Sequence, residues 1–482
     1  MKTRKFCHLL AAVILGGGAA PVSAQQWTDS LRIKVGATAS FASNDFQPLW
    51  IAANRFGMLS DEGLDIAAHA GVWNAHTFPT SRHDFRLEYG FNVINNRHFD
   101  ETRIQQGYLK LQYGALQLRG GRFRDVWGEV DPVLSTGSMG VSGNALPIPK
   151  VGLAVPTFVN VPFTNGWLQV KGAISHGWMG NEQFMKRAWL HEKNLYLRLG
   201  RGPFRMYGGM QHFAVWGGQR GHIRLDRTIG GFFDVLFVKE ANDGYDPDGV
   251  FPNRAGDQRG LIEFGGDLET DHAYWHMHVQ VPFESGMGID IRNIDRLAGL
   301  NVTLKDHRWL DRLQVEFIYT KQMESFQHAE LQSYYNNGLY ATGWEYHYRS
   351  IGTPLFLNRY RGAHFLPYEA VDWSADNPPS LGNMNFINNR IVGGHIGILH
   401  RYAPGISGRT MLTATRNFGT HMSSNPVTAN PRNQLYTLHE VTMAFGRVPG
   451  LQLSAGIAVD AGGLYDNVGG IIGITYQFIN QN

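Results

Sequence analysis

Two histidines have the spacing of a metal-binding pair. His276 and His278 lie two residues apart, so both rings would project from the same face of a β-strand. Imidazole nitrogens in that position could bind a metal ion, but no third ligand is evident near them. The alternative is a pair of hydrogen-bonded histidines in the interior of the protein. We therefore predict no metal site from this pair.

Three aspartates form a second candidate cluster. Asp243, Asp246 and Asp248 lie in a glycine-containing loop, and carboxylate oxygens are the ligands that calcium prefers. The twelfth position of an EF-hand spacing is Arg254, where that motif needs a bidentate glutamate. The pattern favours a solvated acidic loop over a calcium site.

Motifs for covalent or cofactor chemistry are missing from the sequence. The stretch Gly140-Val141-Ser142-Gly143-Asn144 does not have the order of a nucleophile elbow, and no phosphate-binding or dinucleotide-binding glycine loop occurs. We therefore predict a protein without cofactor or enzymatic activity. A hydrolase with a dispersed Ser/His/acid set stays open as an alternative.

The first 24 residues have the pattern of a secretory signal peptide. Three basic residues precede an apolar stretch, and Val22-Ser23-Ala24 has the small side chains of a cleavage site. We expect residues 1–24 to be the signal peptide and residues 25–482 to form one domain. The only cysteine is Cys7, so the mature chain would have no thiol for disulfides or catalysis.

The charge of the chain argues against nucleic acid as a partner. There are 43 Lys and Arg against 40 Asp and Glu, and three of the basic residues lie in the predicted signal peptide. The remaining chain has no basic field of the kind that nucleic acids attract. Arg outnumbers Lys by 32 to 11. That bias suits bidentate recognition of carboxylates, or Arg–Glu ladders inside a barrel.

The elements that must position these residues are β-strands with alternating sides. In the last strand Ile472, Ile474, Tyr476 and Phe478 share one face, and smaller or polar residues share the other. No apolar stretch after residue 24 is long enough for a spanning helix. Secretion, 58 glycines and repeated two-faced strands predict a closed antiparallel transmembrane β-barrel of about 18 strands in the outer membrane, with short helices outside or within the barrel.

The alternation places most of the strands directly. Helical spacing occurs between Ile223 and Glu240, and we also expect a short helix over Glu182–Leu190. The predicted strands are Leu31–Ala39, Phe85–Val93, Tyr108–Tyr113, Leu116–Gly120, Trp167–Trp178, Leu195–Arg201, Phe204–Phe213, Leu261–Leu268, Ala273–Val281, Gly299–Leu304, Leu313–Thr320, Gly343–Tyr348, Arg390–Leu399, Thr410–Arg416, Leu435–Phe445, Leu451–Val459 and Ile472–Phe478.

A series of motifs gives the chain a family resemblance. The segment from Ser138 to Lys150 resembles the SGNA-P-IP segment of the Wzi-type capsule assembly proteins, with Ser142, Gly143, Asn144, Pro147 and Pro149 at the matching positions. Other motifs follow in the same order along the chain. They are Pro48-Leu49-Trp50-Ile51, Asn54-Arg55-Phe56-Gly57, Leu190–Tyr196, Gly209–His212, Trp216-Gly217-Gly218, Gln280–Glu284, Glu316–Thr320, Tyr334–Asn337, Tyr340–Trp344, Ile351–Leu355 and Asn388–Ile391.

The resemblance implies a function at the cell surface. Members of this family are outer-membrane barrels of Gram-negative bacteria that hold capsular polysaccharide. It implies a non-enzymatic monomer whose partners are surface polysaccharide and outer-membrane lipids. Aromatic faces and guanidinium groups suit sugars, so Trp178, Trp216, Trp344 and Arg390 are the candidates for polysaccharide contact.

Each of these candidates also has a structural interpretation. A tryptophan can anchor a barrel at the lipid headgroups or pack in its lumen, and an arginine can pair with lumen carboxylates. An open porin or solute channel is a further alternative for the whole chain. The preceding strands favour a filled lumen, and therefore a surface anchor for polysaccharide over an open pore.

Overall fold

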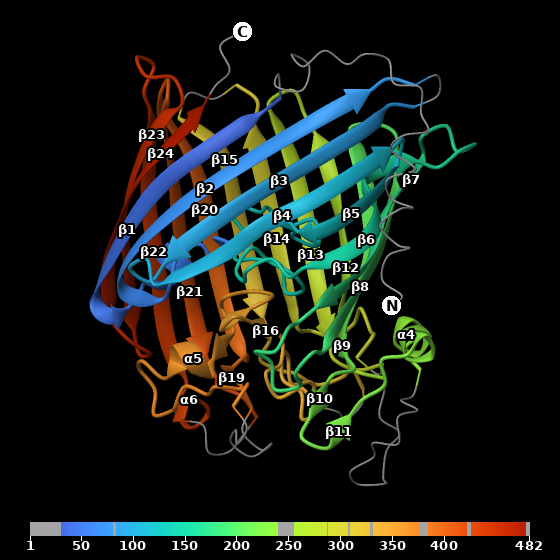
Figure 1. Cartoon of the computed structure of the whole chain (residues 1–482), viewed down its shortest axis with the longest axis vertical. Coiled ribbons are helices and arrows are strands. Elements are labelled where there is room, and N and C mark those ends of the chain that lie inside the picture. The colour runs from blue at the N-terminus through green and yellow to red at the C-terminus, as the bar shows by residue number, and fades with distance from the viewer. Residues whose placement is uncertain are drawn as a thin grey trace, which may run out of the picture.

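Eighteen strands form one closed antiparallel barrel (Figure 1). The computed structural model describes residues 30–80, 83–239, 255–286, 288–306, 309–327, 331–375, 384–421 and 426–478. The predicted signal peptide and the loop of Asp243, Asp246 and Asp248 lie outside these residues and stay predictions. Along the chain every barrel strand pairs with the next one, and the last pairs with the first. The predicted all-β fold and strand number are confirmed.

The barrel strands and the smaller elements have the following bounds. The barrel consists of β1 (Arg32–Phe46), β2 (Glu62–Phe78), β3 (Phe85–Asn96), β4 (Glu101–Tyr113), β5 (Leu116–Arg122), β6 (Lys150–Asn160), β7 (Leu168–Trp178), β8 (Trp189–Leu199), β9 (Phe204–Trp216), β12 (Asp257–Glu269), β13 (Ala273–Phe283), β14 (Arg296–Leu304), β15 (Leu310–Tyr319), β20 (Ile391–Ala403), β21 (Ile406–Asn417), β22 (Arg432–Ala444), β23 (Leu451–Gly462) and β24 (Asn467–Phe478). The connections carry α3 (Leu49–Ala52), β10 (Gln219–Arg220), β11 (Ile223–Arg224), α4 (Ile229–Leu236), β16 (Glu345–Tyr346), β17 (Arg349–Ser350), β18 (Leu357–Asn358), α5 (Arg359–Gly362), β19 (Phe386–Asn388) and α6 (Pro426–Ala429). Among the described residues no helix has the length and apolar character needed to cross a membrane.

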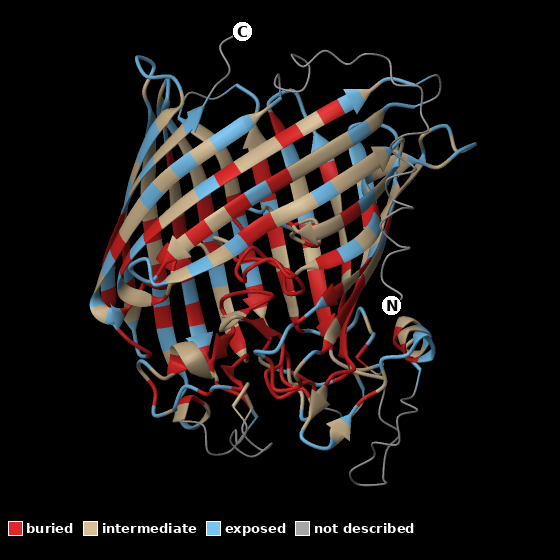
Figure 2. Ribbon diagram, viewed as in Figure 1, coloured by how far each residue is buried: buried red, intermediate tan, exposed pale blue. Residues whose placement is uncertain are grey.

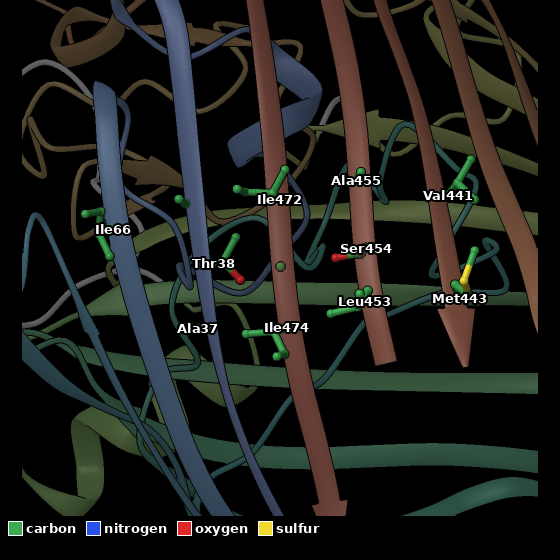
Figure 3. Close-up of a pocket in the computed structure, with 12 residues that line it drawn as sticks. Ala37, Thr38, Ile66, Val441, Met443, Leu453, Ser454, Ala455, Ile472 and Ile474 are labelled. Atoms are coloured by element: carbon green, nitrogen blue, oxygen red, sulfur yellow. The ribbon is translucent and has the colours of Figure 1, made fainter. Parts of the chain in front are cut away.

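The outer surface of the barrel is apolar because large side chains occupy every second strand position. On β24, Ile472, Ile474 and Phe478 are 57, 48 and 49% exposed, as expected of a strand with one side in lipid. Ten residue pairs join β24 to β1 and close the barrel. The resulting seam is slightly hollow (Figure 3). Its lining is almost wholly apolar and comes from β22, β23, β24, β1 and β2, so this hollow is a lipid-facing surface without the polar groups that sugars require.

The long connections leave the barrel at one end, which we call the loop end (Figure 1). At the opposite, turn end, two residues suffice to join β4 to β5 and β20 to β21. Outer-membrane barrels have short periplasmic turns and long extracellular loops. The loop end therefore faces the outside of the cell.

Several local predictions were wrong. Strands β2 and β6 were not predicted, and the strand expected over Gly343–Tyr348 lies within a connection instead of the barrel wall. The helix expected over Glu182–Leu190 is a turn region followed by β8, where the Phe184 N–H donates to the Thr342 hydroxyl at 2.7 Å. Tertiary anchoring overrides the local helical pattern there. The helix expected between Ile223 and Glu240 is the shorter α4.

Candidate functional site

The connection from β5 to β6 fills the lumen, and we call residues 123–149 the lumen segment. Figure 2 shows this buried chain inside the barrel. The backbone N–H and hydroxyl of Thr136 both donate to Glu316 on β15, at 2.8 and 2.7 Å. The Met139 N–H donates to Gln280 on β13 at 3.0 Å. Three contacts from polar wall residues thus hold the segment across the barrel, as expected for a filled lumen.

The predicted histidine pair takes part in this packing. His276 contacts Asp267 through Nδ1 at 2.7 Å and the backbone carbonyl of Glu129, in the lumen segment, through Nε2 at 2.7 Å. The Nε2 atom of His278 lies 3.6 Å from Glu316. Within the described residues no group of three His, Cys, Asp or Glu side chains is placed to hold a metal ion. His276 has the hydrogen-bonding role that the sequence favoured, whereas His278 is buried beside Glu316 without a hydrogen bond to it.

The motif from Ser142 to Pro149 docks the lumen segment onto a second connection. We call residues 320–390, between β15 and β20, the cap segment. The Ser142 N–H donates to the Ile351 carbonyl at 2.8 Å, and the Asn144 amide donates to the Ser350 carbonyl at 3.0 Å. Both motif side chains are buried. Their role in the structure is to join two plug elements.

The remaining motif positions serve the same packing through their backbones. The Gly143 carbonyl accepts from the Phe56 N–H at 2.5 Å, and the Pro147 carbonyl accepts from the Arg122 guanidinium at 2.7 Å. The Pro149 carbonyl accepts from the N–H of Trp178 at 3.0 Å. Apart from Leu146, which lines a hollow among the loops, the motif therefore contacts the interior of the protein.

A buried carboxyl group holds the cap segment together. Glu345 Oε2 accepts from the side-chain amides of Asn358 at 2.5 Å and Asn385 at 2.7 Å. Burial raises the pKa of Glu345 to about 7, although the two amide hydrogen bonds oppose this effect. The cap segment thus contains an acid that changes its charge near neutral pH.

Replacing this acid should remove part of the pH dependence of stability. Because the folded pKa of Glu345 lies above its ordinary value near 4.5, its stabilising contribution is complete below that value and is lost as the pH rises through about 7. Glu345→Gln changes the free energy of unfolding at each pH. We expect this change to be more stabilising at pH 8.5 than at pH 5 by about 1–3 kcal/mol. Thermal unfolding in detergent at both pH values measures this difference. Equal shifts at the two pH values would contradict the prediction.

The four predicted contact residues do not meet in one site. Trp344 and Trp216 are 0 and 1% exposed, so neither ring offers a face to a sugar. The Trp344 indole N–H donates to the Gly140 carbonyl in the lumen segment at 2.6 Å. Trp178 is 40% exposed on the outside of the barrel. Arg390 donates from Nε to the Lys321 carbonyl at 2.9 Å.

A different group of side chains forms a polar hollow among the loops, which we call the loop-end pocket. Four chain segments contribute to it: the connections β1–β2 and β3–β4 with the start of β4, the lumen segment and the cap segment. It is therefore assembled only when the lumen is filled. The pocket is lined by Gly57, Leu59, Ser60, Asp61, Asn96, Arg97, Glu101, Arg103, Leu146, His347, Tyr348, Arg349 and Tyr360.

Stacked aromatic rings and guanidinium groups give the loop-end pocket its chemistry. The rings of Tyr348 and Tyr360 stack with centroids 4.6 Å apart. Arg97 pairs with Glu62 at 2.9 Å and Arg103 pairs with Glu101, while both arginines line the pocket. Burial raises the pKa of both tyrosines, so their phenols stay neutral and can donate or accept hydrogen bonds. Flat faces beside bidentate donors suit sugar rings and their carboxylates.

The backbone of this pocket is strained at several residues. Arg97, His347 and Tyr348 have φ of 55, 50 and 64°, in the left-handed region that residues with a side chain rarely adopt. Such conformations cost on the order of 1–3 kcal/mol each and cluster at functional sites. His347 Nδ1 also lies 2.5 Å from Glu182, and this contact is the main cause of the lowered pKa of Glu182. Contacts with the surrounding structure must hold Tyr348 and His347 in these conformations at the pocket wall.

The motifs and spacings in the sequence did not predict this pocket. Arg97 lies between β3 and β4, Arg103 lies at the start of β4, and Tyr348 and Tyr360 lie in the cap segment, so these residues show no regular spacing. The available signal was the aromatic and arginine content of the run from Tyr346 to Arg361. That run alone does not tell which side chains reach the surface.

Comparison with known proteins places this barrel among relatives. The family model described as capsule assembly protein Wzi matches residues 73–357, more than half of the chain. The chain belongs to this family. The match covers the lumen segment and the part of the cap segment that contains Tyr348. The family model therefore includes residues of both segments that fill the barrel. Comparison with curated proteins gave no match.

A solved structure of the same family has the same kind of barrel. Wzi of Escherichia coli, an outer-membrane protein involved in group 1 capsule assembly and described as a carbohydrate-binding β-barrel, is 12% identical with a TM-score of 0.54. The alignment covers 95% of this chain and 86% of that one. OpdL of Pseudomonas aeruginosa is 9% identical with a TM-score of 0.49, over 93% of this chain and 98% of that one. The membership in the Wzi family and the barrel fold make this chain an outer-membrane protein.

Proposed function

We propose that this barrel binds surface polysaccharide at its loop-end pocket and helps to hold a capsule on the cell. The observation that carries the proposal is the stacked pair Tyr348 and Tyr360 beside Arg97 and Arg103 at the outward-facing end. The carbohydrate binding of the Escherichia coli member of the family supports it. The guanidinium groups favour a polysaccharide with acidic sugars, because a carboxylate can accept two parallel hydrogen bonds from one arginine.

The proposed function needs neither catalysis nor transport. Asp61 pairs with Arg349 at 3.2 Å and with Arg361 at 3.3 Å, and Glu101 pairs with Arg103. Glycoside hydrolysis uses two carboxyl groups that are available to the substrate, whereas both carboxylates of the pocket contact arginines. The filled lumen supports an anchor over a channel. Closure of β24 on β1 within one chain means that a single chain forms the whole barrel, as the proposed monomer requires.

Removing one ring of the pair tests the site. Tyr360→Ala removes one of the two stacked faces, and aromatic contacts contribute about 0.5–1.5 kcal/mol, so the dissociation constant should rise about 2–12-fold. Arg103→Gln should weaken binding of acidic polysaccharide by about tenfold or more, since a charged hydrogen bond contributes about 1.5–3 kcal/mol. Binding of polysaccharide from the host strain to purified barrel in detergent measures both effects.

A tyrosine at the other end of the barrel provides the control. Tyr402 is 37% exposed near the turn end, and Tyr402→Ala should leave binding unchanged. The variants must keep the heat-modifiable migration of a folded barrel. If folded Tyr360→Ala and Arg103→Gln bind as the parent does, while the parent binds polysaccharide, the pocket is not the site. If the folded parent does not bind, the function itself is wrong.

A further inference from the structure

Polar side chains occupy the lipid side of β7, β8 and β9 near the loop end. His176, His191, Lys193 and His212 alternate with inward-facing residues and so project outward. Further along β8 the same face carries Leu195 and two more leucines that are about half exposed, as a lipid-facing surface requires. Uncovered polar groups at this place would be costly in contact with hydrocarbon.

Helix α4 covers this polar patch. It lies outside the barrel wall beside β9 (Figure 1). The centroid of its Phe232 ring lies 5.5 Å from that of His191 and 6.1 Å from that of His176. Val235 packs against Ala214 and Trp216 of β9, and Lys193 donates to the carbonyl of Leu236 at the end of the helix. A cation at the helix C-terminus is favourable, so helix and lysine stabilise each other.

The ends of α4 are built to hold it as a helix despite its eight residues. The Thr228 hydroxyl accepts from the Gly231 N–H at 3.2 Å and donates to Asp226 at 3.0 Å. The Thr228 N–H also donates to Asp226 at 2.7 Å. Short helices are marginal without such caps and without tertiary packing. The geometry of α4 is therefore fixed relative to the wall.

The opposite side of α4 is also apolar. Ile229, Phe233 and Phe237 are four residues apart and line one side of the helix and its C-terminal cap, with exposed fractions of 78, 47 and 64%. In water such a row would cost on the order of 1.5–3 kcal/mol for each side chain. The row continues the apolar surface of the strands below it. Arg227 and Lys239, at either end, are exposed cations.

We propose that α4 is an interfacial helix that lies in the outer leaflet, with Ile229, Phe233 and Phe237 in contact with lipid. Its Phe232 side shields the polar patch, and its Phe233 side enters the boundary between headgroups and acyl chains. Trp178 and Trp189 lie at the same level of the wall, where aromatic side chains gather in membrane barrels. The partner of this surface is therefore lipid, and α4 sets the depth of the barrel in the membrane.

Fluorescent labelling of α4 tests the proposal. In a Cys7→Ser background, the variants Phe233→Cys and Phe237→Cys are labelled with an environment-sensitive dye and reconstituted into vesicles that contain doxyl lipids. Leu197→Cys on the lipid face of β8 and His222→Cys between β10 and β11 provide the lipid and water controls. We expect quenching at positions 233 and 237 to reach about half or more of the quenching at 197, and to exceed that at 222 several-fold.

Two results would overturn the proposal. In the first, the dyes at positions 233 and 237 both show the emission of a dye in water and are quenched by iodide, as the dye at position 222 is. The other is shielding from water that appears only at high protein density, which would assign the surface to a second copy of the chain. Folding of each labelled variant is checked by heat-modifiable migration, and having two helix positions guards against failure of one variant.

Discussion

Excision of residues 129–139 should turn the barrel into an open pore. The excision removes the part of the lumen segment that contacts Glu263, Gln280 and Glu316. Barrels of 16–18 strands leave an aqueous channel when nothing fills them, so conductance should rise about tenfold or more. The excision also removes Glu129 and Asp131, which pair with Lys171 and Arg312, so both carboxylates and cations of the wall would face the pore. Single-channel recording in planar bilayers measures the conductance.

The structure allows this excision with little disturbance to the rest of the plug. The Trp127 N–H donates to the Val141 carbonyl at 3.0 Å, so joining Gly128 to Gly140 closes a two-residue turn between paired positions. Two glycines are well suited to such a turn. A control that changes Glu129 to Gln and Asp131 to Asn keeps the bulk of the segment and should stay closed. A pore that remains closed after excision would mean that the cap segment alone seals the barrel.

The substitution Lys150→Met should destabilise the barrel by about 3–5 kcal/mol. Lys150 is 4% exposed and pairs with Glu192 at 2.7 Å and with Asp125 at 3.3 Å. Asp125 also pairs with Arg119 at 3.3 Å, so it keeps a cation after the substitution. Glu192 is 1% exposed and would lose the ammonium group that offsets its burial. Urea unfolding in detergent, followed by tryptophan fluorescence, measures the change.

A second substitution separates the lost ion pair from lost packing. Lys150→Met combined with Glu192→Gln removes both charges, and most of the stability should return because no charge is left without a partner. Lys305 pairs with Glu269 at 2.7 Å on the surface, and Lys305→Met should leave the unfolding midpoint unchanged. If the double variant is as unstable as the single one, packing of the lysine stem and not its charge determines the loss.

Alternation of side chains predicts the barrel wall well because lipid and lumen impose opposite demands on successive residues. The strand expected at Leu31–Ala39 is part of β1, and the face expected for Ile472 and Ile474 is the lipid face. Strand β2 was not predicted because Ala, Gly and His interrupt its alternation of apolar and polar side chains. Strand β6 was not predicted because it contains Pro156. Gly343–Tyr348 alternates in the same manner but belongs to the cap segment. Local alternation does not distinguish a wall strand from a plug strand.

The site could not be predicted because its residues are brought together by the plug. Trp216 faces outward on β9 and is buried only because α4 lies over it, and Trp344 is buried by the lumen segment. The residues next to these tryptophans in the sequence do not indicate that α4 or the lumen segment will pack over them. Tyr348 and Tyr360 reach the surface only because the cap segment folds back between them. The family motif contains Ser142 and Asn144, which the structure shows to join the two segments in the lumen, but it does not reveal the pocket above them.

The hydrogen bonds between Ser142 and Ile351 affect the order in which parts of the protein can fold. These partners are 209 residues apart, and eight of the 18 barrel strands lie between them in the sequence. Closing so long a loop is slow and entropically costly. Until the cap segment has been added, the lumen segment lacks the contacts that hold Ser142 and Asn144. The loop-end pocket, whose lining runs from Gly57 to Tyr360, therefore needs both segments in place before it could bind the proposed ligand.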